Sequence, residues 1–177
     1  DLQFLAGRFH ATPWGHHVNE GEPEWPPSPW RFLRALTAAW KTSAADIPQE
    51  QVERLLTKLA EPPVYCLPPA TLGHTRHYMP QAGNSTLLVH DAFVCVDRDD
   101  QAPRLSIVWE TEELSPEEKP LLDRILLGLS YFGRAESWCE ATRREDTITP
   151  NSAPSGYALS SVESNDLTNL LCPAPDV

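Results

Sequence analysis

The chain has 177 residues, 41% of them hydrophobic, and carries a formal net charge of -11 at pH 7. This length suits one ordinary domain with a sizeable core, and no apolar run approaches the roughly 18 residues that would cross a bilayer, so we expect no membrane contact. The acidic balance disfavours indiscriminate nucleic-acid binding, which needs clustered Lys and Arg. Residues 25–45 and 62–90 nevertheless contain no Asp or Glu, and such windows can bind an anion locally.

The first part of the chain predicts a strand followed by two helices. Residues 2–11 alternate roughly between apolar and polar side chains, which is a strand pattern, and Gly7 within it is suited to a bulge. A loop rich in Gly and Pro follows. The pair Ser28-Pro29 is typical of a helix N-cap and first turn, so a helix is expected from there to about residue 42. A second, shorter helix is expected to end at the prolines of residues 62–63.

The first predicted helix lies in the unusual stretch WPPSPWRFLRALTAAW, residues 25–40. Its apolar positions recur at helical spacing and form a core stripe: Leu33, Leu36 and Trp40. Its basic positions fall on a separate flank: Arg31, Arg34 and Lys41. This flank either is solvated or meets an anionic ligand, and the tryptophans are expected in the core or at a subunit contact.

The second part of the chain predicts strands, one helix and a tail. Strand patterns are found in four segments: residues 64–70, 87–97, 104–111 and 137–145. The second and third of these are expected to pair as a hairpin. Residues 71–85 lack periodicity and predict a loop or an exposed hairpin. The sequence SPEE at residues 115–118 is a capping-box pattern, and the helix after it is expected to end near Gly133.

The order of these elements predicts the fold class. It is close to the β-α-β-β-α-β plan of ferredoxin-like (RRM-like) domains, which are α+β structures with an antiparallel sheet and two main helices on one face. Residues 1–146 are expected to form this domain. An excursion at residues 71–90 is expected to leave the domain, and residues 147–177 are expected to be a tail or linker.

The cysteines give no sign of a metal site or a disulfide framework. They are far apart, with no C-x-x-C pair: Cys66, Cys95, Cys139 and Cys172. The pattern favours buried, reduced thiols in a cytoplasmic protein, and a zinc site is the minor alternative. We expect no metal and no cofactor. The N-terminal residues also lack the pattern of a secretory signal.

Two groups of residues indicate chemistry. The segment HTRHYM, residues 74–79, combines an arginine for phosphate with rings and a methionine that can stack on or wedge between bases, which favours contact with single-stranded RNA. His16 and His17, with His10 nearby, are suited either to general acid–base cleavage of RNA or to a ligand-contacting or structural role. His74 and His77 could begin a metal site, but no neighbouring ligand completes it.

Three stretches carry a resemblance to a known family: GRFHATPWGHHVNEGEPEWPPSPWRFLRAL, HTRHYMP and LSYFGRAESW. Together they resemble the RAMP-superfamily subunit of type I-G (formerly I-U) CRISPR systems, a fusion of a Cas-five-like half and a Cas-six-like half. The resemblance covers roughly Gly7 to Trp138. The chain is too short for both halves, and the glycine-rich loop of many RAMP nucleases is not seen, so no catalytic residue is carried over.

The resemblance implies a fold, partners and a role. It implies a ferredoxin-like RAMP domain with a thumb-like insertion between its second and third strands, a place that residues 71–90 occupy. It implies that the protein caps the five-prime handle of the CRISPR RNA in a Cascade ribonucleoprotein complex used in antiviral defence. Contacts with the backbone and large subunits are implied too, near the point where target DNA enters. Cutting of the precursor RNA is expected in the Cas-six-like half.

The first interpretation is therefore a CRISPR RNA-binding subunit that does not cut RNA. One alternative is a metal-independent endoribonuclease that processes precursor CRISPR RNA, with the histidines at positions 10, 16 and 17 as candidates. The other is a subunit that serves assembly only. The residues predicted to bind RNA are Arg8, His16, His17, Asn19, Arg31, Arg34, His74, Arg76, His77, Tyr78 and Arg134.

Overall fold

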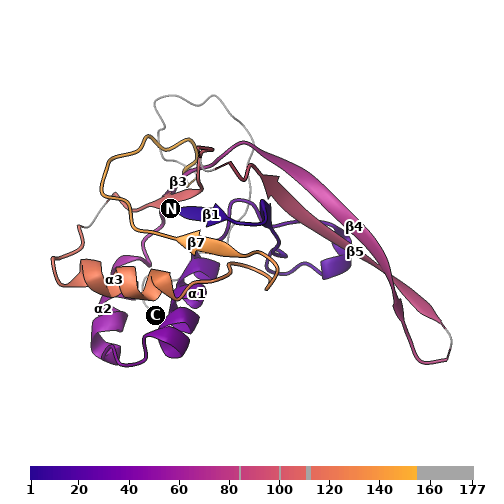
Figure 1. The fold of residues 1–177 in the computed structure, drawn as a ribbon, viewed down its shortest axis with the longest axis horizontal. Coiled ribbons are helices and arrows are strands. Elements are labelled where there is room, and N and C mark those ends of the chain that lie inside the picture. Colours follow the sequence, from indigo (N-terminus) through magenta and orange to yellow (C-terminus); the bar gives the residue numbers. More distant parts are fainter. Residues whose placement is uncertain (84, 100, 111–112, 155–177) are drawn as a thin grey trace.

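The first helix begins at the predicted cap. The computed structural model describes residues 1–83, 85–99, 101–110 and 113–154, and its helix α1 spans Pro29–Ser43 (Figure 1). The Ser28 hydroxyl accepts a hydrogen bond from the Arg31 backbone N–H at 3.3 Å, and Pro29 occupies the first turn. The predicted core stripe is confirmed, because all three of its side chains are buried: Leu33, Leu36 and Trp40.

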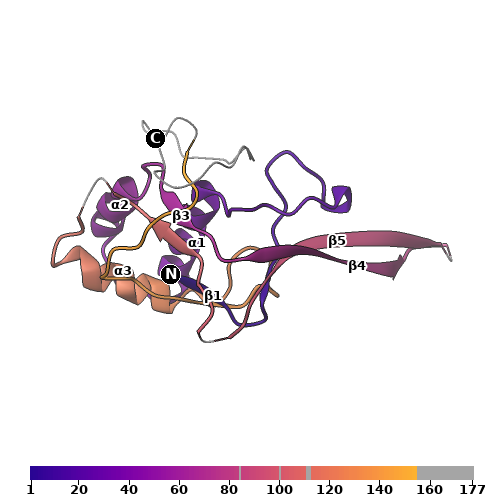
Figure 2. The same cartoon turned by 90° about the horizontal axis from the view of Figure 1, so that it is seen from above.

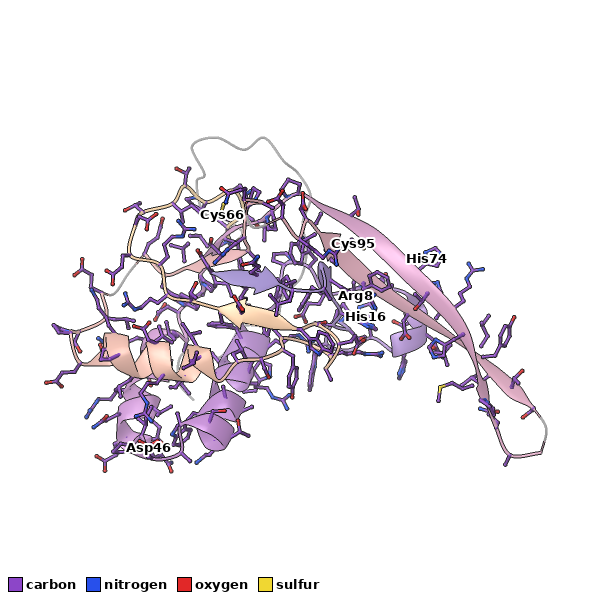
Figure 3. The ribbon with its side chains drawn as sticks, in the orientation of Figure 1. Arg8, His16, Asp46, Cys66, His74 and Cys95 are labelled. Atoms are coloured by element: carbon purple, nitrogen blue, oxygen red, sulfur yellow. The ribbon has the colours of Figure 1, made fainter. Side chains whose placement is uncertain are left out.

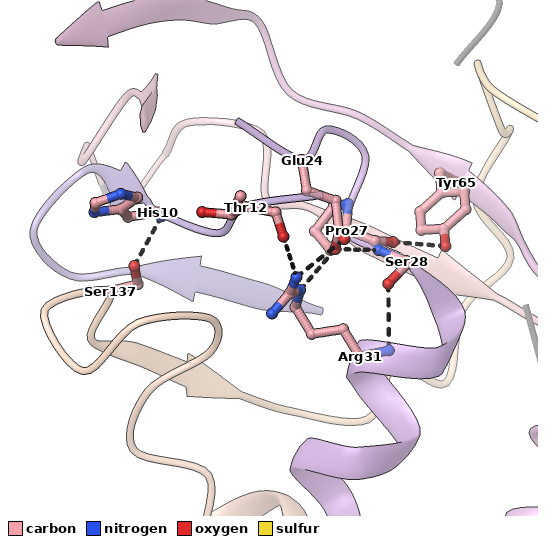
Figure 4. A network of polar contacts seen from close by, with 8 residues as sticks. All are labelled: His10, Thr12, Glu24, Pro27, Ser28, Arg31, Tyr65 and Ser137. Atoms are coloured by element: carbon pink, nitrogen blue, oxygen red, sulfur yellow. Dashed lines mark hydrogen bonds and ion pairs between the residues drawn. The ribbon is translucent and has the colours of Figure 1, made fainter. Parts of the chain in front are cut away.

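The loop before α1 is fastened by a buried carboxylate (Figure 4). Glu24 is 4% exposed, and its side chain accepts hydrogen bonds from the Ser28 backbone N–H at 2.8 Å and from Arg31 Nε at 2.7 Å. Arg31 Nη2 also donates to the Thr12 carbonyl at 2.8 Å. The Tyr65 hydroxyl donates to the Pro27 carbonyl at 2.9 Å. The proline-rich stretch is therefore held by side chains from three parts of the chain.

Two further α-helices are described, α2 (Gln49–Lys58) and α3 (Glu118–Leu127). The capping box is confirmed: the Glu118 N–H donates to the Ser115 hydroxyl at 3.2 Å, and the Ser115 N–H donates to a Glu118 carboxylate oxygen at 2.7 Å. The expectation that this helix reaches Gly133 is wrong. The chain leaves the helix at Gly128, where a Cβ would lie 2.7 Å from Cβ of Ser43 on α1, and residues 130–132 then run extended beside residues 137–139.

Four short strands form two antiparallel pairs: β1 (Leu2–Phe4) with β7 (Cys139–Ala141), and β3 (Val64–Cys66) with β6 (Ser106–Val108). A bridge joins the two pairs, because the Leu2 N–H donates to the Leu105 carbonyl at 2.7 Å and the Leu105 N–H donates back at 3.2 Å. The strands thus follow one another in the order β7-β1-β6-β3. The α+β class is confirmed. The side chains of the helices and of β1 share one hydrophobic core.

A long hairpin projects from this body (Figures 1 and 2). Its strands are β4 (Ala70–Pro80) and β5 (Thr86–Val96), and the short β2 (Arg8–Phe9) pairs with the inner end of β5. The predicted pairing of β5 with residues 104–111 is wrong: β5 pairs with β4, and β6 pairs with β3. The polar segment of residues 74–79 gave no strand signal, yet its backbone pairs with β5 in unbroken register.

Two boundaries differ from the sequence prediction in smaller ways. The strand expected over residues 2–11 is split into β1 and β2 by a turn at Gly7, whose φ of 61° is left-handed, as a bulge position requires. Part of the expected tail packs on the body: Ser152 forms an antiparallel bridge with Tyr65 on β3, and the Asn151 side chain bonds both backbone groups of Leu67. Residues 155–177 of that predicted tail lie outside the described residues. No helix in the described part of the chain is long and apolar enough to cross a bilayer.

Replacing Arg31 with Ala should destabilise the protein, because the Glu24 carboxylate would stay buried without its cation. We expect the free energy of unfolding to fall by about 3 kcal/mol, the usual cost of breaking a buried pair. Urea titration followed by circular dichroism measures it. The matched control is Arg34→Ala, since Arg34 is exposed on the same helix; it should change stability by less than about 0.5 kcal/mol. Equal effects of the two variants would contradict the assignment.

The thiol of Cys139 should be inert in the folded protein. Burial, with a smaller contribution from Glu140, raises the pKa of this thiol to about 12. At pH 8 the group is therefore protonated, and iodoacetamide should not alkylate it until urea unfolds the chain. Half-buried Cys66 and Cys95 serve as references on the same peptide map. Labelling of Cys139 at the rate of an unfolded cysteine would show that β7 does not pack as described.

Candidate nucleic-acid interface

The hairpin register sorts the predicted RNA-binding residues onto two faces. Side chains that lie opposite each other across an antiparallel pair share a face, and neighbours along one strand do not. His74 lies opposite Ala92, Arg76 opposite His90, and Tyr78 opposite Leu88. We call this surface face A, defined as His74, Arg76, Tyr78, Leu88 and His90. Face B is the other surface, defined as Thr75, His77, Val89, Asp91 and Phe93.

Face A carries positive charge and rings without a paired acid. The rings of His74 and His90 lie 5.2 Å apart between centroids, and Arg76 is directly opposite His90 in the register. Among the described residues, no carboxylate lies within ion-pair distance of Arg76. Tyr78 is 69% exposed. This combination suits a phosphate at the guanidinium and bases on the rings.

A loop flanks face A and carries three more of the predicted residues. It contains the short 3-10 helix η1 (Val18–Glu20), and it approaches the hairpin closely: a Cβ at Gly21 would lie 3.0 Å from Nδ1 of His90. His16 and Arg8 lie near the inner end of the hairpin, and His74 lies farther out (Figure 3). His17 and Asn19 are exposed on this loop. The loop that carries His16, His17 and Asn19 thus meets face A at His90.

One ring nitrogen of His16 already has carboxylate partners. Its Nδ1 lies 2.8 Å from a Glu20 carboxylate oxygen and 3.2 Å from one of Glu22. His10, the third histidine of the cleavage alternative, is only 4% exposed, and its Nδ1 lies 2.6 Å from the Glu136 carboxylate. A carboxylate therefore holds Nδ1 of each ring, and His10 is buried while the His16 side chain is 39% exposed. His17 has no such partner among the described residues.

Face B begins with a stack of three groups. Gly73 lies opposite Phe93, whose ring covers it so closely that a Cβ at Gly73 would lie 2.6 Å from the ring. The Arg8 guanidinium carbon lies 4.6 Å from the centroid of the same ring, a cation–π contact. Arg8 reaches this position because β2 places it opposite Cys95. No carboxylate among the described residues pairs with Arg8.

Farther along face B, three basic side chains lie around Asp91. It accepts a hydrogen bond from Arg134 Nη1 at 3.0 Å, its other oxygen lies 3.7 Å from His77 Nδ1, and His10 Nε2 lies 3.9 Å away. Since Asp91 is on β5 and Arg134 follows α3, this ion pair joins the hairpin to the body. Together with Glu136, which contacts His10, these residues form one polar cluster where the hairpin meets the body: His10, His77, Asp91, Arg134 and Glu136.

The loop that carries Arg134 is built to reach the hairpin. The Arg134 N–H donates to the His10 carbonyl at 2.8 Å, and the His10 N–H donates to the Ser137 hydroxyl at 2.8 Å. Gly133 has a φ of 93°, and a Cβ there would lie 2.5 Å from the His10 carbonyl oxygen. The sequence GRAES of residues 133–137 therefore forms a clamp on the segment after β2.

The remaining predicted residues lie elsewhere. Arg31 is held by Glu24, and Arg34 is exposed on α1, in the body rather than on the hairpin. Sequence reasoning missed His90, Phe93, Asp91 and Glu136. A period-two reading of the strand LLVHDAFVCVD would have placed His90 and Asp91 on opposite faces, but nothing in the sequence indicates that Glu136 meets His10.

A cleft of about 600 Å³ is a separate feature, between β6, the start of α3 and residues 141–148. Its basic side chains have acidic partners: Arg143 binds Asp123, Arg144 binds Asp1, and Lys58 binds Glu118. In the described ranges, no three His, Cys, Asp or Glu side chains are placed to hold a metal ion. The hairpin therefore remains the stronger candidate site for an anionic polymer.

The clamp predicts a large difference between two glycine substitutions. Gly83, at the hairpin turn, has a φ of 84° and open space around it, so Gly83→Ala should cost about 1–2 kcal/mol of stability from backbone strain alone. Gly133→Ala adds the clash with the His10 carbonyl and should cost roughly 2 kcal/mol more. Denaturant unfolding measures both variants. Similar losses would argue against the close approach of this loop.

Comparison with protein-family models, with curated protein sequences and with solved structures finds no match to this chain. The family assignment from the sequence motifs therefore stays a prediction, and the site must be judged by its own geometry.

Proposed function

We propose that this protein is a CRISPR RNA-binding subunit of a type I Cascade complex, and that it holds the five-prime handle of the guide RNA without cutting it. The observation that carries the proposal is face A, where the hairpin aligns His74, Arg76 and Tyr78 next to the loop of His17 and Asn19. A protein that binds single-stranded RNA needs phosphate contacts and base-stacking surfaces close to each other.

The strand order supports a ferredoxin-like (RRM-like) RAMP domain. In that plan four antiparallel strands lie in the order 4-1-3-2, with one helix after the first strand and one after the third. The order β7-β1-β6-β3 corresponds to it when β1, β3, β6 and β7 are taken as strands one to four. Helix α1 then follows the first strand and α3 the third, and α2 is an addition to the plan.

The place of the hairpin supports the thumb-like insertion that the sequence resemblance implies. β4 and β5 leave the body after β3 and return before β6, between strands two and three of the ferredoxin-like plan. The insertion spans residues 70–96, somewhat more than the expected 71–90. Other subunits can reach an RNA strand that lies against a projecting hairpin from several sides. This arrangement suits an RNA handle that several proteins surround, rather than one that binds in a groove of a single protein.

The charge distribution supports selective rather than indiscriminate binding. The chain is acidic overall at -11, so long duplexes are repelled, while residues 62–90 contain no acid. Only a strand that reaches face A gains the Arg76 contact and the stacking surfaces. Recognition of this kind depends on shape and stacking as well as on counterion release, so salt should weaken it moderately.

The tip of the hairpin supports contact with other subunits. Two pairs near its end are apolar, one on each face: Tyr78 and Leu88 are 69% and 46% exposed, and Met79 and Leu87 are 51% and 43% exposed. A two-stranded ribbon cannot bury both faces by itself, so the tip fits between surfaces of protein partners. In the proposed complex these are the backbone and large subunits, with target DNA nearby, in the cytoplasm. A role in assembly alone is the second candidate, and the same tip favours it.

The double variant Arg76→Ala/Tyr78→Ala should weaken binding of the handle RNA at least about tenfold, because it removes one phosphate contact and one stacking ring. The matched control is His77→Ala/Met79→Ala, which alters the neighbouring positions on face B and should stay within about threefold of the unmodified protein. Fluorescence anisotropy with a labelled handle oligonucleotide measures both. The control also removes an apolar tip residue, so it reports on any general effect of hairpin damage.

Two outcomes would reject the proposal. If the two double variants bind RNA equally well, face A does not hold the handle. If the protein assembles with partner subunits after ribonuclease treatment, and the unmodified protein binds no RNA, the assembly-only function is correct.

A further inference from the structure

A row of exposed apolar side chains crosses three neighbouring segments of the body. Leu5 lies opposite Trp138, because the Leu5 N–H donates to the Trp138 carbonyl at 2.9 Å and continues the β1–β7 register. Tyr131 forms an antiparallel bridge with Trp138 from the other side. Residues directly opposite each other share a face, so the three side chains lie side by side. We call Tyr131, Trp138 and Leu5 the aromatic row.

The aromatic row faces away from the helices. Phe4 and Cys139, the neighbouring pair in the register, are buried in the core, so Leu5 and Trp138 point to the opposite side. Phe132 and Ser137 are fully buried next to Tyr131 and Trp138. Yet Trp138 is 60% exposed, Tyr131 is 50% exposed and Leu5 is 46% exposed. Large aromatic side chains gathered on one surface and left open in this way indicate an interaction site.

Charge beside the row favours an anionic ligand on one side. The loop between Tyr131 and Trp138 carries Arg134, which is partly exposed while it binds Asp91, and Arg8 lies over Phe93 on the adjoining part of β5 without a carboxylate partner among the described residues. The Glu136 carboxylate of the same loop is turned onto His10. On the opposite side of the row, Glu140 is exposed two residues after Trp138 and would repel phosphate there.

From this juxtaposition we propose that the aromatic row is a second nucleic-acid site, which stacks bases of a single strand on Trp138 and Tyr131 while its phosphates run on the side of Arg134 and Arg8. The proposal rests on the ferredoxin-like domain and RNA-binding role proposed above, since aromatic side chains on the open face of such a sheet are a common way to stack bases. The site is separate from face A and needs no change in the hairpin. Its ligand is a single-stranded RNA or DNA segment of a few nucleotides.

The test uses the purified full chain and fluorescein-labelled oligonucleotides of about 12 nucleotides, in RNA and DNA versions, at low salt. Trp138→Ala and Tyr131→Ala should each lower the affinity about tenfold, because each removes one stacking surface. Trp138→Phe keeps a ring and should stay within about threefold. The matched control is Leu127→Ala, an apolar side chain 88% exposed at the end of α3, which should have no effect. A preference for the RNA version would show that the ligand is RNA, and equal binding of the DNA version would admit a DNA strand.

Photo-crosslinking separates this proposal from the role of the hairpin. Oligonucleotides that contain 5-iodouracil should crosslink to Trp138 or Tyr131 and, independently, to residues 74–78. If the crosslinks reach only the hairpin and Trp138→Ala binds normally, the aromatic row is not a nucleic-acid site, while the proposed function stands. If they reach only the aromatic row, face A is wrongly assigned. If Trp138→Ala impairs only assembly with other subunits without nucleic acid, the row is a protein contact and the inference is overturned.

Discussion

A two-stranded ribbon has no core of its own, so the β4–β5 hairpin relies on its contacts with the body. These are the ion pair between Asp91 and Arg134, the pairing of β2 with β5, and the burial of Val94 in the core. The ion pair lies under the His10 ring and beside His77, and Glu136 closes the cluster from the loop side. Because Gly133 lets the loop approach the His10 carbonyl, one short turn of chain positions both Arg134 and Glu136. The two proposed binding surfaces, face A and the aromatic row, are both attached to this turn or to the strand that it holds.

The same contacts explain how an acidic protein can offer a local site for an anion. Three carboxylates meet a basic or imidazole group: Glu24 meets Arg31 in the body, Asp91 meets Arg134 on the hairpin, and Glu136 meets His10 beside it. Neutralised in this way, they add little repulsion, and the charges of Arg76 and Arg8 remain uncompensated by any described carboxylate. Net charge therefore describes long-range behaviour, while the geometry of pairs decides what a short strand meets on contact.

Local sequence patterns predicted the local structure well, but they did not predict contacts between residues far apart in the sequence. The cap at Ser28, the capping box at Ser115 and the stripe of Leu33 could be predicted because each depends on residues within two helical turns. The partner of β5 could not, since the polar segment of residues 74–79 forms its strand through backbone bonds that leave no hydrophobic pattern. For the same reason HTRHYM was read as one contact set, although strand alternation sends His77 to the face opposite Arg76. Arg31 looked like a free cation because its acid lies before the cap, in a loop whose course no pattern indicated.

The Tyr65–Ser152 bridge has a consequence for how copies of the chain meet. An uncovered outer strand offers a row of free amides and carbonyls on which another chain can template itself, a common start of aggregation. Asn151 and Ser152 occupy those groups at Tyr65 and Leu67, so this border of the body is sealed. The outer border of β4 has no such cover in the described chain. A sheet-extending association between molecules is therefore favoured at the projecting arm over the border at β3.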